Sequence, residues 1–140
     1  MELDAALAFA RPRRQGVLTT LRANGRPQIS NIMFAVGDDD VARISVTASR
    51  AKSKNLLRDP RASLYVPGDS FWEYAVLDGD ADLSPVAATP DDATVDELVS
   101  LYRAISGEHT DWAEYRASMV ADGRLVIRLR PTHAYGQISA

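Results

Sequence analysis

Residues 15–36, QGVLTTLRANGRPQISNIMFAV, decide the fold class of this 140-residue chain. Residues 15–22 are rich in β-branched side chains, which is typical of a strand. Asn24-Gly25 follows, and this pair is the strongest short hairpin signal because both residues tolerate positive φ. The return strand, 27–36, carries apolar side chains on both faces, so we expect it to be buried on both sides. The sheet therefore begins as an antiparallel hairpin.

The remaining elements continue this pattern of consecutive hairpins with helices inserted. Strands are expected at 41–48, 62–66, 71–83 and 124–130, the last of them closing before Pro131. Helices are expected at 2–10, at 50–58 with Ser49 as N-cap, from Thr89 as N-cap to Gly107, and at 111–121. No βαβ rhythm is present, so the sequence predicts a mainly β, α+β class with about six antiparallel strands.

Composition excludes several classes of function. With 140 residues, 46% of them hydrophobic, the chain is expected to form one packed domain, 1–140. Its net charge of −3 lacks the basic character of a nucleic-acid-binding protein. It has no cysteine and two histidines, which argues against thiol chemistry and metal centres. No apolar run approaches the ~18 residues of a membrane span, and no cationic secretion signal opens the chain, so we expect a cytoplasmic protein. Redox chemistry would need a bound organic cofactor.

The charges are unevenly distributed along the chain. Residues 62–102 contain nine acids and no Lys or Arg, whereas residues 50–61 contain five bases and the single acid Asp59. Both lysines, Lys52 and Lys54, lie in this basic segment, and a second basic run occupies residues 11–14. Such a run indicates either a solvated helix face or a local anion site.

An anion site is favoured by the strand that precedes this basic helix. Alternation along 41–48 places Arg43, Ser45 and Thr47 on one face. The following helix has Arg50 and Lys52 in its first turn and no acid, although cations there oppose the helix dipole. A bound anion would resolve this conflict, with the strand hydroxyls as further donors. The alternative is that both cations extend into water.

Other candidate residues are weaker signals. Asn31 lies in the strand expected to be buried, where its amide would bond either to backbone or to the polar edge of a bound ring. Trp72 and Tyr74 point the same way at the start of a strand, which indicates a core, a dimer interface or a stacking surface for a planar cofactor. His133, after the last strand, reaches either a site or solvent. Nothing resembles a catalytic triad or a paired-carboxylate site.

The segments 25–31 (GRPQISN), 50–56 (RAKSKNL) and 58–63 (RDPRAS) resemble the pyridoxamine-phosphate-oxidase-like split β-barrel flavoproteins. Within that group the chain is most similar to the flavin/deazaflavin oxidoreductases that bind coenzyme F420. Residues 72–75, 94–98, 101–103, 107–109 and 132–136 are similar as well, so the resemblance covers nearly the whole chain. Order and spacing carry it, since no single motif is decisive.

The resemblance implies a split β-barrel and a cofactor site shared across a homodimer. The cofactor phosphate would be held by the basic segment, its ribityl chain would lie along the third strand, its ring would face the second strand, and aromatic residues would come from the partner subunit. The basic segment would contribute Arg50, Lys52, Ser53 and Asn55, and the third strand would contribute Ser45, Val46 and Thr47. The second strand would contribute Asn31, Ile32 and Met33. The partner subunit would contribute Trp72 and Tyr74, with His133 as a further contact.

The implied chemistry is hydride transfer between coenzyme F420 and a small organic substrate, with the ring as the reacting group and no obligate acid or base. The poly-glutamate tail of F420 would suit Lys54, Arg58 and the arginines at 11, 13 and 14. Two alternatives stay open: an FMN-dependent oxidoreductase, and a non-catalytic cofactor-binding or storage protein. Pyridoxamine phosphate oxidases themselves are longer and use further C-terminal bases, which argues against that substrate.

Overall fold

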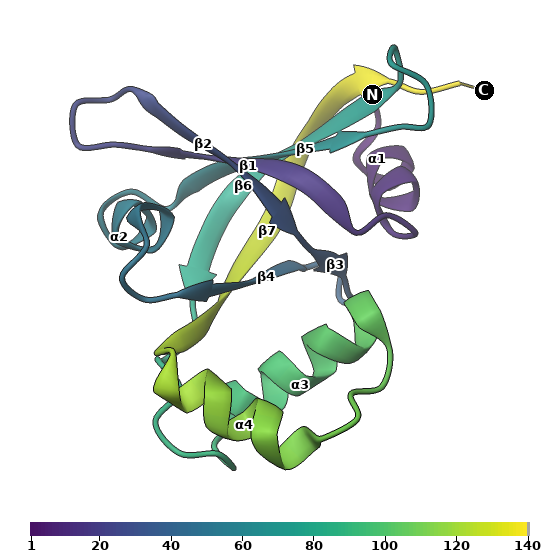
Figure 1. Ribbon diagram of the computed structural model, residues 1–140. Helices are drawn as coiled ribbons and strands as arrows, with labels where there is room; N and C mark the ends of the chain where they lie inside the picture. Colours follow the sequence, from purple (N-terminus) through teal and green to yellow (C-terminus); the bar gives the residue numbers. More distant parts are fainter. Residues whose placement is uncertain (140) are drawn as a thin grey trace.

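The computed structural model describes residues 1–139 as a curled antiparallel sheet with four helices around it (Figure 1). The strands are β1 (Gln15–Leu21), β2 (Pro27–Met33), β3 (Ala35–Val36), β4 (Ala42–Thr47), β5 (Arg61–Pro67), β6 (Tyr74–Leu83) and β7 (Arg124–Gln137). The helices are α1 (Leu3–Ala10), α2 (Ala51–Arg58), α3 (Ala93–Ser106) and α4 (Trp112–Ala121). None of the helices in this described part is long and apolar enough to span a bilayer.

The sheet has the order β2-β1-β5-β6-β7-β4-β3, and every neighbouring pair is antiparallel. β2 and β3 lie at opposite ends of this order, yet only Phe34 separates them along the chain. The sheet must therefore curl until its ends meet, which leaves a seam where β2 approaches β4. This is the split β-barrel of the α+β class that the sequence predicts.

Seven strands form where about six were expected, because the predicted strand 27–36 breaks at Phe34. The backbone N–H of Phe34 donates to the carbonyl oxygen of Arg14 (2.8 Å), and its side chain is fully buried. The segment before it pairs with β1 and the segment after it pairs with β4. Phe34 thus transfers the chain from one side of the seam to the other.

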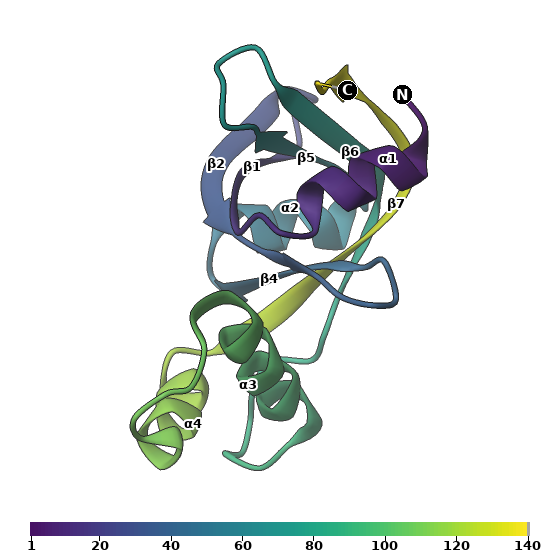
Figure 2. The ribbon, with the colours of Figure 1, turned by 90° about the vertical axis from the view of Figure 1, so that its right-hand side faces the viewer.

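One main core fills the inside of the curl, and α1 and α2 lie at its opposite ends (Figure 1). Figure 2 shows α1 in front of the barrel and α2 behind it. Alternate residues of the strands, such as Leu18, Leu64 and Ile127, are fully buried in this core. A second cluster joins α3 and α4 to β7 through Val95, Leu98, Val99, Met119 and Val126.

The expectation that the second strand is buried on both faces is wrong for the single chain. β2 pairs only with β1, so it is an edge strand at the seam. Ile29 is 62% exposed and Met33 is 46% exposed, and Asn31 between them is exposed too. The side chains of Ile29 and Met33 are thus left largely uncovered by residues 1–139.

The last strand also differs from its prediction, because β7 continues through Pro131 to Gln137. A bulge between Asp78 and Gly79 shifts the register opposite Pro131, which accommodates a residue without an N–H in a paired strand. His133 is consequently part of β7 rather than the segment after it. On the paired strand, β6 begins at Tyr74, so Phe71 and Trp72 lie in the preceding turn.

Two predicted helix caps are also corrected. The N-cap of α3 is Asp92 rather than Thr89, because the Asp92 carboxylate accepts the N–H of Val95 at 2.9 Å. The N-cap of α2 is Arg50 rather than Ser49, and no side chain caps that helix. The predicted end of α3 at Gly107, in a positive-φ conformation, is confirmed.

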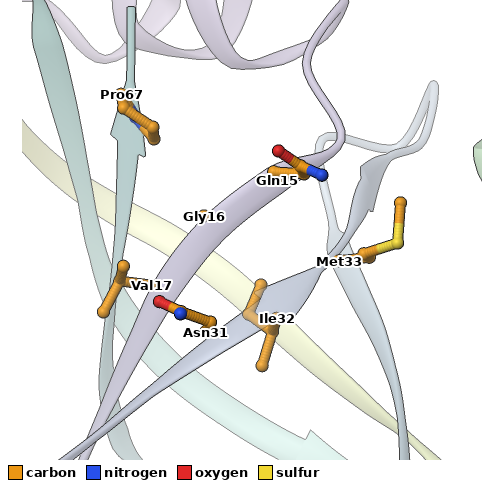
Figure 3. Close-up of a pocket in the computed structure, with 7 residues that line it drawn as sticks. All are labelled: Gln15, Gly16, Val17, Asn31, Ile32, Met33 and Pro67. Atoms are coloured by element: carbon orange, nitrogen blue, oxygen red, sulfur yellow. The ribbon is translucent and has the colours of Figure 1, made fainter.

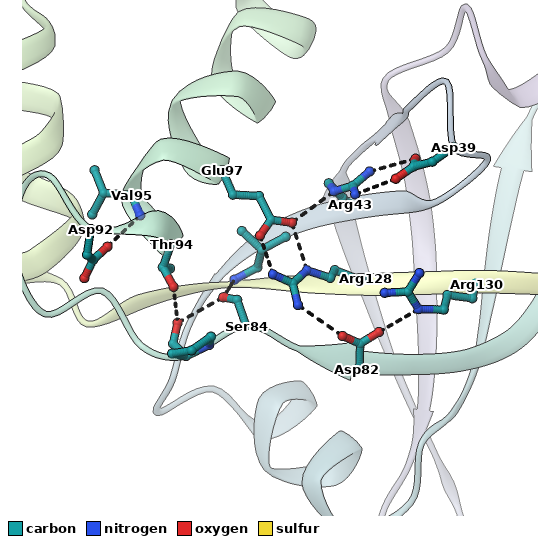
Figure 4. Close-up of polar contacts among 12 residues, drawn as sticks. Asp39, Arg43, Asp82, Ser84, Asp92, Thr94, Val95, Glu97, Arg128 and Arg130 are labelled. Atoms are coloured by element: carbon teal, nitrogen blue, oxygen red, sulfur yellow. Dashed lines mark hydrogen bonds and ion pairs between the residues drawn. The ribbon is translucent and has the colours of Figure 1, made fainter.

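An ion-pair network fastens α3 to the sheet (Figure 4). The Glu97 carboxylate accepts hydrogen bonds from Arg43 Nε (3.0 Å), Arg128 Nε (2.9 Å) and Arg128 Nη2 (2.5 Å). Asp82 and Asp39 bind the outer sides of these arginines. Hydrogen bonds from Arg128 lower the pKa of Glu97 despite its burial, and those from Arg43 lower the pKa of Asp39 to about 2.

Glu97→Gln is expected to lower the free energy of unfolding at pH 7 by about 1–3 kcal/mol, because two arginines lose their shared anion. The folded-state pKa of Glu97 is depressed, so its contribution is present at neutral pH and is lost as pH falls through that pKa. Urea unfolding should show a smaller difference in the free energy of unfolding between Glu97→Gln and wild type in acid than at pH 7. Glu108→Gln, at an exposed pair with Arg103, is the control with little effect. Equal stabilities of Glu97→Gln and wild type at pH 7 would refute this role.

Candidate functional site

A hollow of about 380 Å³ lies at the seam of the barrel, where four elements meet. β2 supplies residues 30–33, β4 supplies residues 45–47, the start of α2 supplies Arg50 and Lys52, and β7 supplies Arg124. Most of the residues expected to bind a cofactor are thus brought together: Asn31, Ile32, Met33, Ser45, Val46, Thr47, Arg50 and Lys52.

Local sequence explains how β4 and α2 build this hollow. Ile44 and Val46 point into the core, so the alternating Ser45 and Thr47 stay on the other face. The chain then turns, with Arg50 N–H donating to Thr47 O (3.1 Å), and α2 begins directly at the hollow. Because no side chain caps α2, the N–H groups of its first turn remain available to a ligand.

The electrostatics of the hollow favour an anion. Three cations line it, Arg50, Lys52 and Arg124, and no carboxylate is among its lining residues. Within residues 1–139, Arg50 and Lys52 make no ion pair, whereas most other arginines do. Burial, together with the charges of Arg50 and Arg124, lowers the pKa of Lys52. The charged form of Lys52 is thus less favourable than that of a lysine in water, and a bound anion would stabilise it.

Two buried polar atoms of the hollow lack hydrogen-bond partners. Ser30 Oγ and Arg124 Nε are the two such side-chain atoms found among residues 1–139, and both residues line the hollow. A buried donor without a partner is costly, so its presence points to a ligand. The donors available, guanidinium, ammonium, hydroxyl and free N–H, fit a phosphate ester.

Sequence reasoning missed Arg124 as a site residue. It is 77 residues from Thr47 in the chain, and only the pairing of β4 with β7 places it opposite Thr47. Nothing in the local sequence around Asp122-Gly123-Arg124 distinguishes this arginine from the other arginines of β7. The register of the sheet is the signal that finds it.

Ser53 and Asn55 do not line the hollow, although we expected them near the phosphate. Both are buried: Ser53 Oγ donates to Thr47 O (2.9 Å), and Asn55 Nδ2 donates to Thr20 Oγ1 (3.1 Å). The Asn55 amide oxygen also accepts from Arg58. Their side chains hold α2 against β1 and β4, and so position the cations of its first turn.

Trp72, Tyr74 and His133 also lie away from the hollow of their own chain. Trp72 is 70% exposed. Tyr74 stacks on Tyr65 with ring centroids 5.4 Å apart. His133 Nδ1 lies 3.2 Å from Asp78 Oδ2 on the outer face of the sheet. They could reach such a hollow only in a second copy of the chain.

A second hollow of about 480 Å³ adjoins the first on the other side of β2 (Figure 3). It shares Asn31, Ile32 and Met33 with the first, and its further lining residues are Gln15, Gly16, Val17 and Pro67. β2 therefore lies between a cationic hollow and a mostly uncharged one. This arrangement suits a ligand with an anionic end and a planar uncharged end.

The profile of the family described as pyridoxamine 5'-phosphate oxidase matches residues 3–138. The chain belongs to the pyridoxamine 5'-phosphate oxidase family. Members of this family include flavin-binding oxidoreductases, so a flavin-type cofactor agrees with the cationic hollow.

Solved structures show the same fold. A protein described as an F420 reductase is 27% identical, with a TM-score of 0.68, and the match covers 92% of this chain and 94% of that one. A conserved hypothetical protein from Mycobacterium tuberculosis has a TM-score of 0.72 at 21% identity, covering 96% and 82%. The heme storage protein HutZ from Vibrio cholerae has a TM-score of 0.68 at 16% identity, covering 97% and 95%. The split barrel of this oxidase family is thus shared by a protein described as a reductase and by one described as a heme storage protein.

Proposed function

We propose that this member of the pyridoxamine 5'-phosphate oxidase family is a coenzyme F420-dependent oxidoreductase that transfers a hydride between the deazaflavin and a small organic substrate. The observation that carries the proposal is the hollow at the seam, with three cations, no carboxylate and two buried polar atoms without partners. The similarity to an F420 reductase at 27% identity supports the choice of cofactor.

Each part of the hollow takes one part of the cofactor in this proposal. Arg50 and Lys52 bind the phosphate, residues 45–47 of β4 follow the ribityl chain, and residues 31–33 of β2 face the ring. The bound deazaflavin would supply the hydride chemistry itself. No carboxylate or histidine lines either hollow, so the protein's contribution is to bind and orient the reactants and to exclude water.

The distribution of unpaired cations favours F420 over FMN. Five Lys and Arg side chains make no ion pair or hydrogen bond within residues 1–139: Arg22, Arg26, Arg50, Lys52 and Lys54. Lys54 lies on α2, and the two arginines flank the β1–β2 turn near the other end of that helix, where Arg58 donates to Leu21 O (2.8 Å). An anionic tail leaving the phosphate site would meet these charges.

The other bases that we expected to bind the tail are engaged elsewhere. Arg11 binds Gly37 O and Asp40, Arg13 binds Phe9 O, and Arg14 binds Ala104 O. Arg58 connects α2 to β1. We therefore assign the tail to Lys54 and the two turn arginines instead of to residues 11–14 and 58.

A homodimer completes the site in this proposal. The outer face of the sheet over β2, β1, β5 and the first half of β6 is covered by no helix of its own chain. A row of side chains crosses this part of the face from Asn31 through Val17, Tyr65 and Val76 to Tyr135. Exposed Ile29 and Met33 flank the β2 end of this row. Asn31 and Met33 belong both to this face and to the hollow, so a second copy on the face would bring its Trp72, Tyr74 and His133 toward the cofactor.

FMN is the second candidate, because the cationic hollow meets the needs of any flavin phosphate. A non-catalytic cofactor-binding role is the third candidate, because a heme storage protein has the same fold. Turnover of bound F420H2 with candidate acceptors separates the third candidate from the first.

Titration of the purified protein with F420 and with FMN, followed by fluorescence quenching, tests the choice of cofactor. We expect tighter binding of F420, and an affinity for F420 that falls as salt rises, because exposed charges are screened over a Debye length of about 8 Å. Lys54→Ala should reduce this salt dependence and leave FMN affinity unchanged. Tighter binding of FMN, or salt-independent binding of F420, would contradict the proposal.

A further inference from the structure

Arg124 differs from the other arginines of its strand in what it contacts. Arg128, also on β7, binds both oxygens of Glu97, and Arg130 binds Asp82. Arg124 has only a long contact from Nη1 to Ser45 Oγ (3.4 Å), and Asp122 Oδ2 lies 3.8 Å from its Nε, beyond hydrogen-bond distance. Its side chain is 33% exposed and its Nε is buried without a hydrogen-bond partner, so the hydrogen-bonding capacity of the guanidinium is largely unused.

Arg124 and Ser30 reach the hollow from opposite sides. Arg124 reaches the hollow from β7, on one side of β4, while Ser30 reaches it from β2 on the other. The Ser30 hydroxyl is likewise buried without a partner. Arg124 is also close enough to Lys52 to lower the pKa of that lysine. Like charges held together in this way destabilise the ligand-free site and favour a multiply charged anion.

We propose, on the basis of the function proposed above, that Arg124 and Ser30 are binding residues of the same site: the Arg124 guanidinium binds two oxygens of the cofactor phosphate, and the Ser30 hydroxyl donates to the ligand from β2. A planar guanidinium fork matches phosphate geometry. The phosphate is then bound by α2, β7 and β2 together, instead of by the basic segment alone.

The test compares Arg124→Gln with wild type and with Arg130→Gln, which removes the same charge from the same strand outside the hollow. Dissociation constants for F420 and FMN and the melting temperature with and without inorganic phosphate are measured for each. Arg124→Gln should bind both cofactors about tenfold or more weakly and lose the phosphate-induced rise in melting temperature. Its ligand-free melting temperature should stay equal or rise, because Lys52 loses a like-charged neighbour. Arg130→Gln should bind both cofactors within twofold of wild type.

Two further variants sharpen the result. Arg124→Lys keeps the charge and loses the fork, so its affinity should lie between those of wild type and Arg124→Gln. Ser30→Ala should weaken binding severalfold, and an unchanged dissociation constant would remove Ser30 from the site.

The outcomes separate this inference from the proposed function. If Lys52→Ala loses affinity for the cofactor but Arg124→Gln stays within twofold of wild type, Arg124 does not bind the phosphate and the proposed function stands. If Arg124→Gln lowers the ligand-free melting temperature markedly, the residue is structural and the inference is overturned. If wild type binds neither cofactor nor phosphate, the proposed function fails and the inference fails with it.

Discussion

Lys52→Ala is expected to weaken cofactor binding about tenfold to a hundredfold while leaving the ligand-free protein as stable as before, or slightly more stable. The lysine lies in the first turn of α2, where a cation opposes the helix dipole, so its removal relieves up to about 1 kcal/mol. With phosphate bound, the same ammonium makes a charge-assisted hydrogen bond of roughly 1.5–3 kcal/mol, which is lost in the variant. Fluorescence titration and thermal unfolding measure the two effects separately.

Lys54→Ala is the matched control, because it removes the same charge from the exposed side of the same helix. It should leave FMN affinity unchanged. A dissociation constant for Lys52→Ala within twofold of wild type would place the anion site elsewhere. A lowered melting temperature of ligand-free Lys52→Ala would show that the lysine stabilises the fold instead of binding an anion.

The pH dependence of binding follows from the same lysine. Because the pKa of Lys52 is lowered from 10.5 in the ligand-free protein, it loses its charge at a lower pH than an ordinary lysine. A bound anion raises that pKa again, so binding takes up a proton in the interval between the two values. Affinity should therefore fall as pH rises through the alkaline range. Lys52→Ala should not show this fall.

Ile29→Glu is expected to convert the proposed homodimer into a monomer, and the affinity for the cofactor should fall with this change. Ile29 is 62% exposed in the single chain, so a charge there is compatible with the fold. In a two-fold pair formed by the outer sheet face, the same charge would be buried without a partner, which should weaken association more than a hundredfold. Sedimentation equilibrium at micromolar concentration measures the change.

Leu57→Glu on α2 is the control for that experiment, since Leu57 is 76% exposed but lies off the sheet face. It should remain dimeric. A wild-type monomer, or an Ile29→Glu protein that sediments as wild type does, would contradict the role given to Trp72 and Tyr74, because these residues do not line the hollow of their own chain.

Much of the barrel and of the cationic hollow could be predicted from local sequence. The Asn24-Gly25 turn, the alternation of β4 and the basic first turn of α2 each depend on neighbouring residues, and each forms as expected. The apolar residues on both faces of β2 led to the wrong prediction that this strand is buried on both sides within the chain. Such a pattern indicates which residues avoid water, but not whether the same chain or another one covers them.

The rest depends on pairing between distant segments. β7 passes Pro131 because the register shifts there: Gly79 pairs with Pro131 and Asp78 with His133, which leaves Thr132 of β7 as the extra residue of a bulge. Only the pairing with β6 reveals this shift. Arg124 enters the site only through its register with Thr47. The N-cap of α3 was predicted at Thr89, but the Asp92 carboxylate accepts the N–H groups of Ala88, Thr89 and Val95 and caps the helix instead.

A crystal structure of the protein grown with coenzyme F420 tests the central claim most directly. We expect the cofactor phosphate to contact Arg50 and Lys52 of one protomer and the ring to lie beside residues 31–33 of β2. Trp72 or Tyr74 of the second protomer should lie near the same ring. A phosphate bound outside the cationic hollow would contradict the proposed cofactor site, and a complete site formed by a single chain would contradict the proposed homodimer.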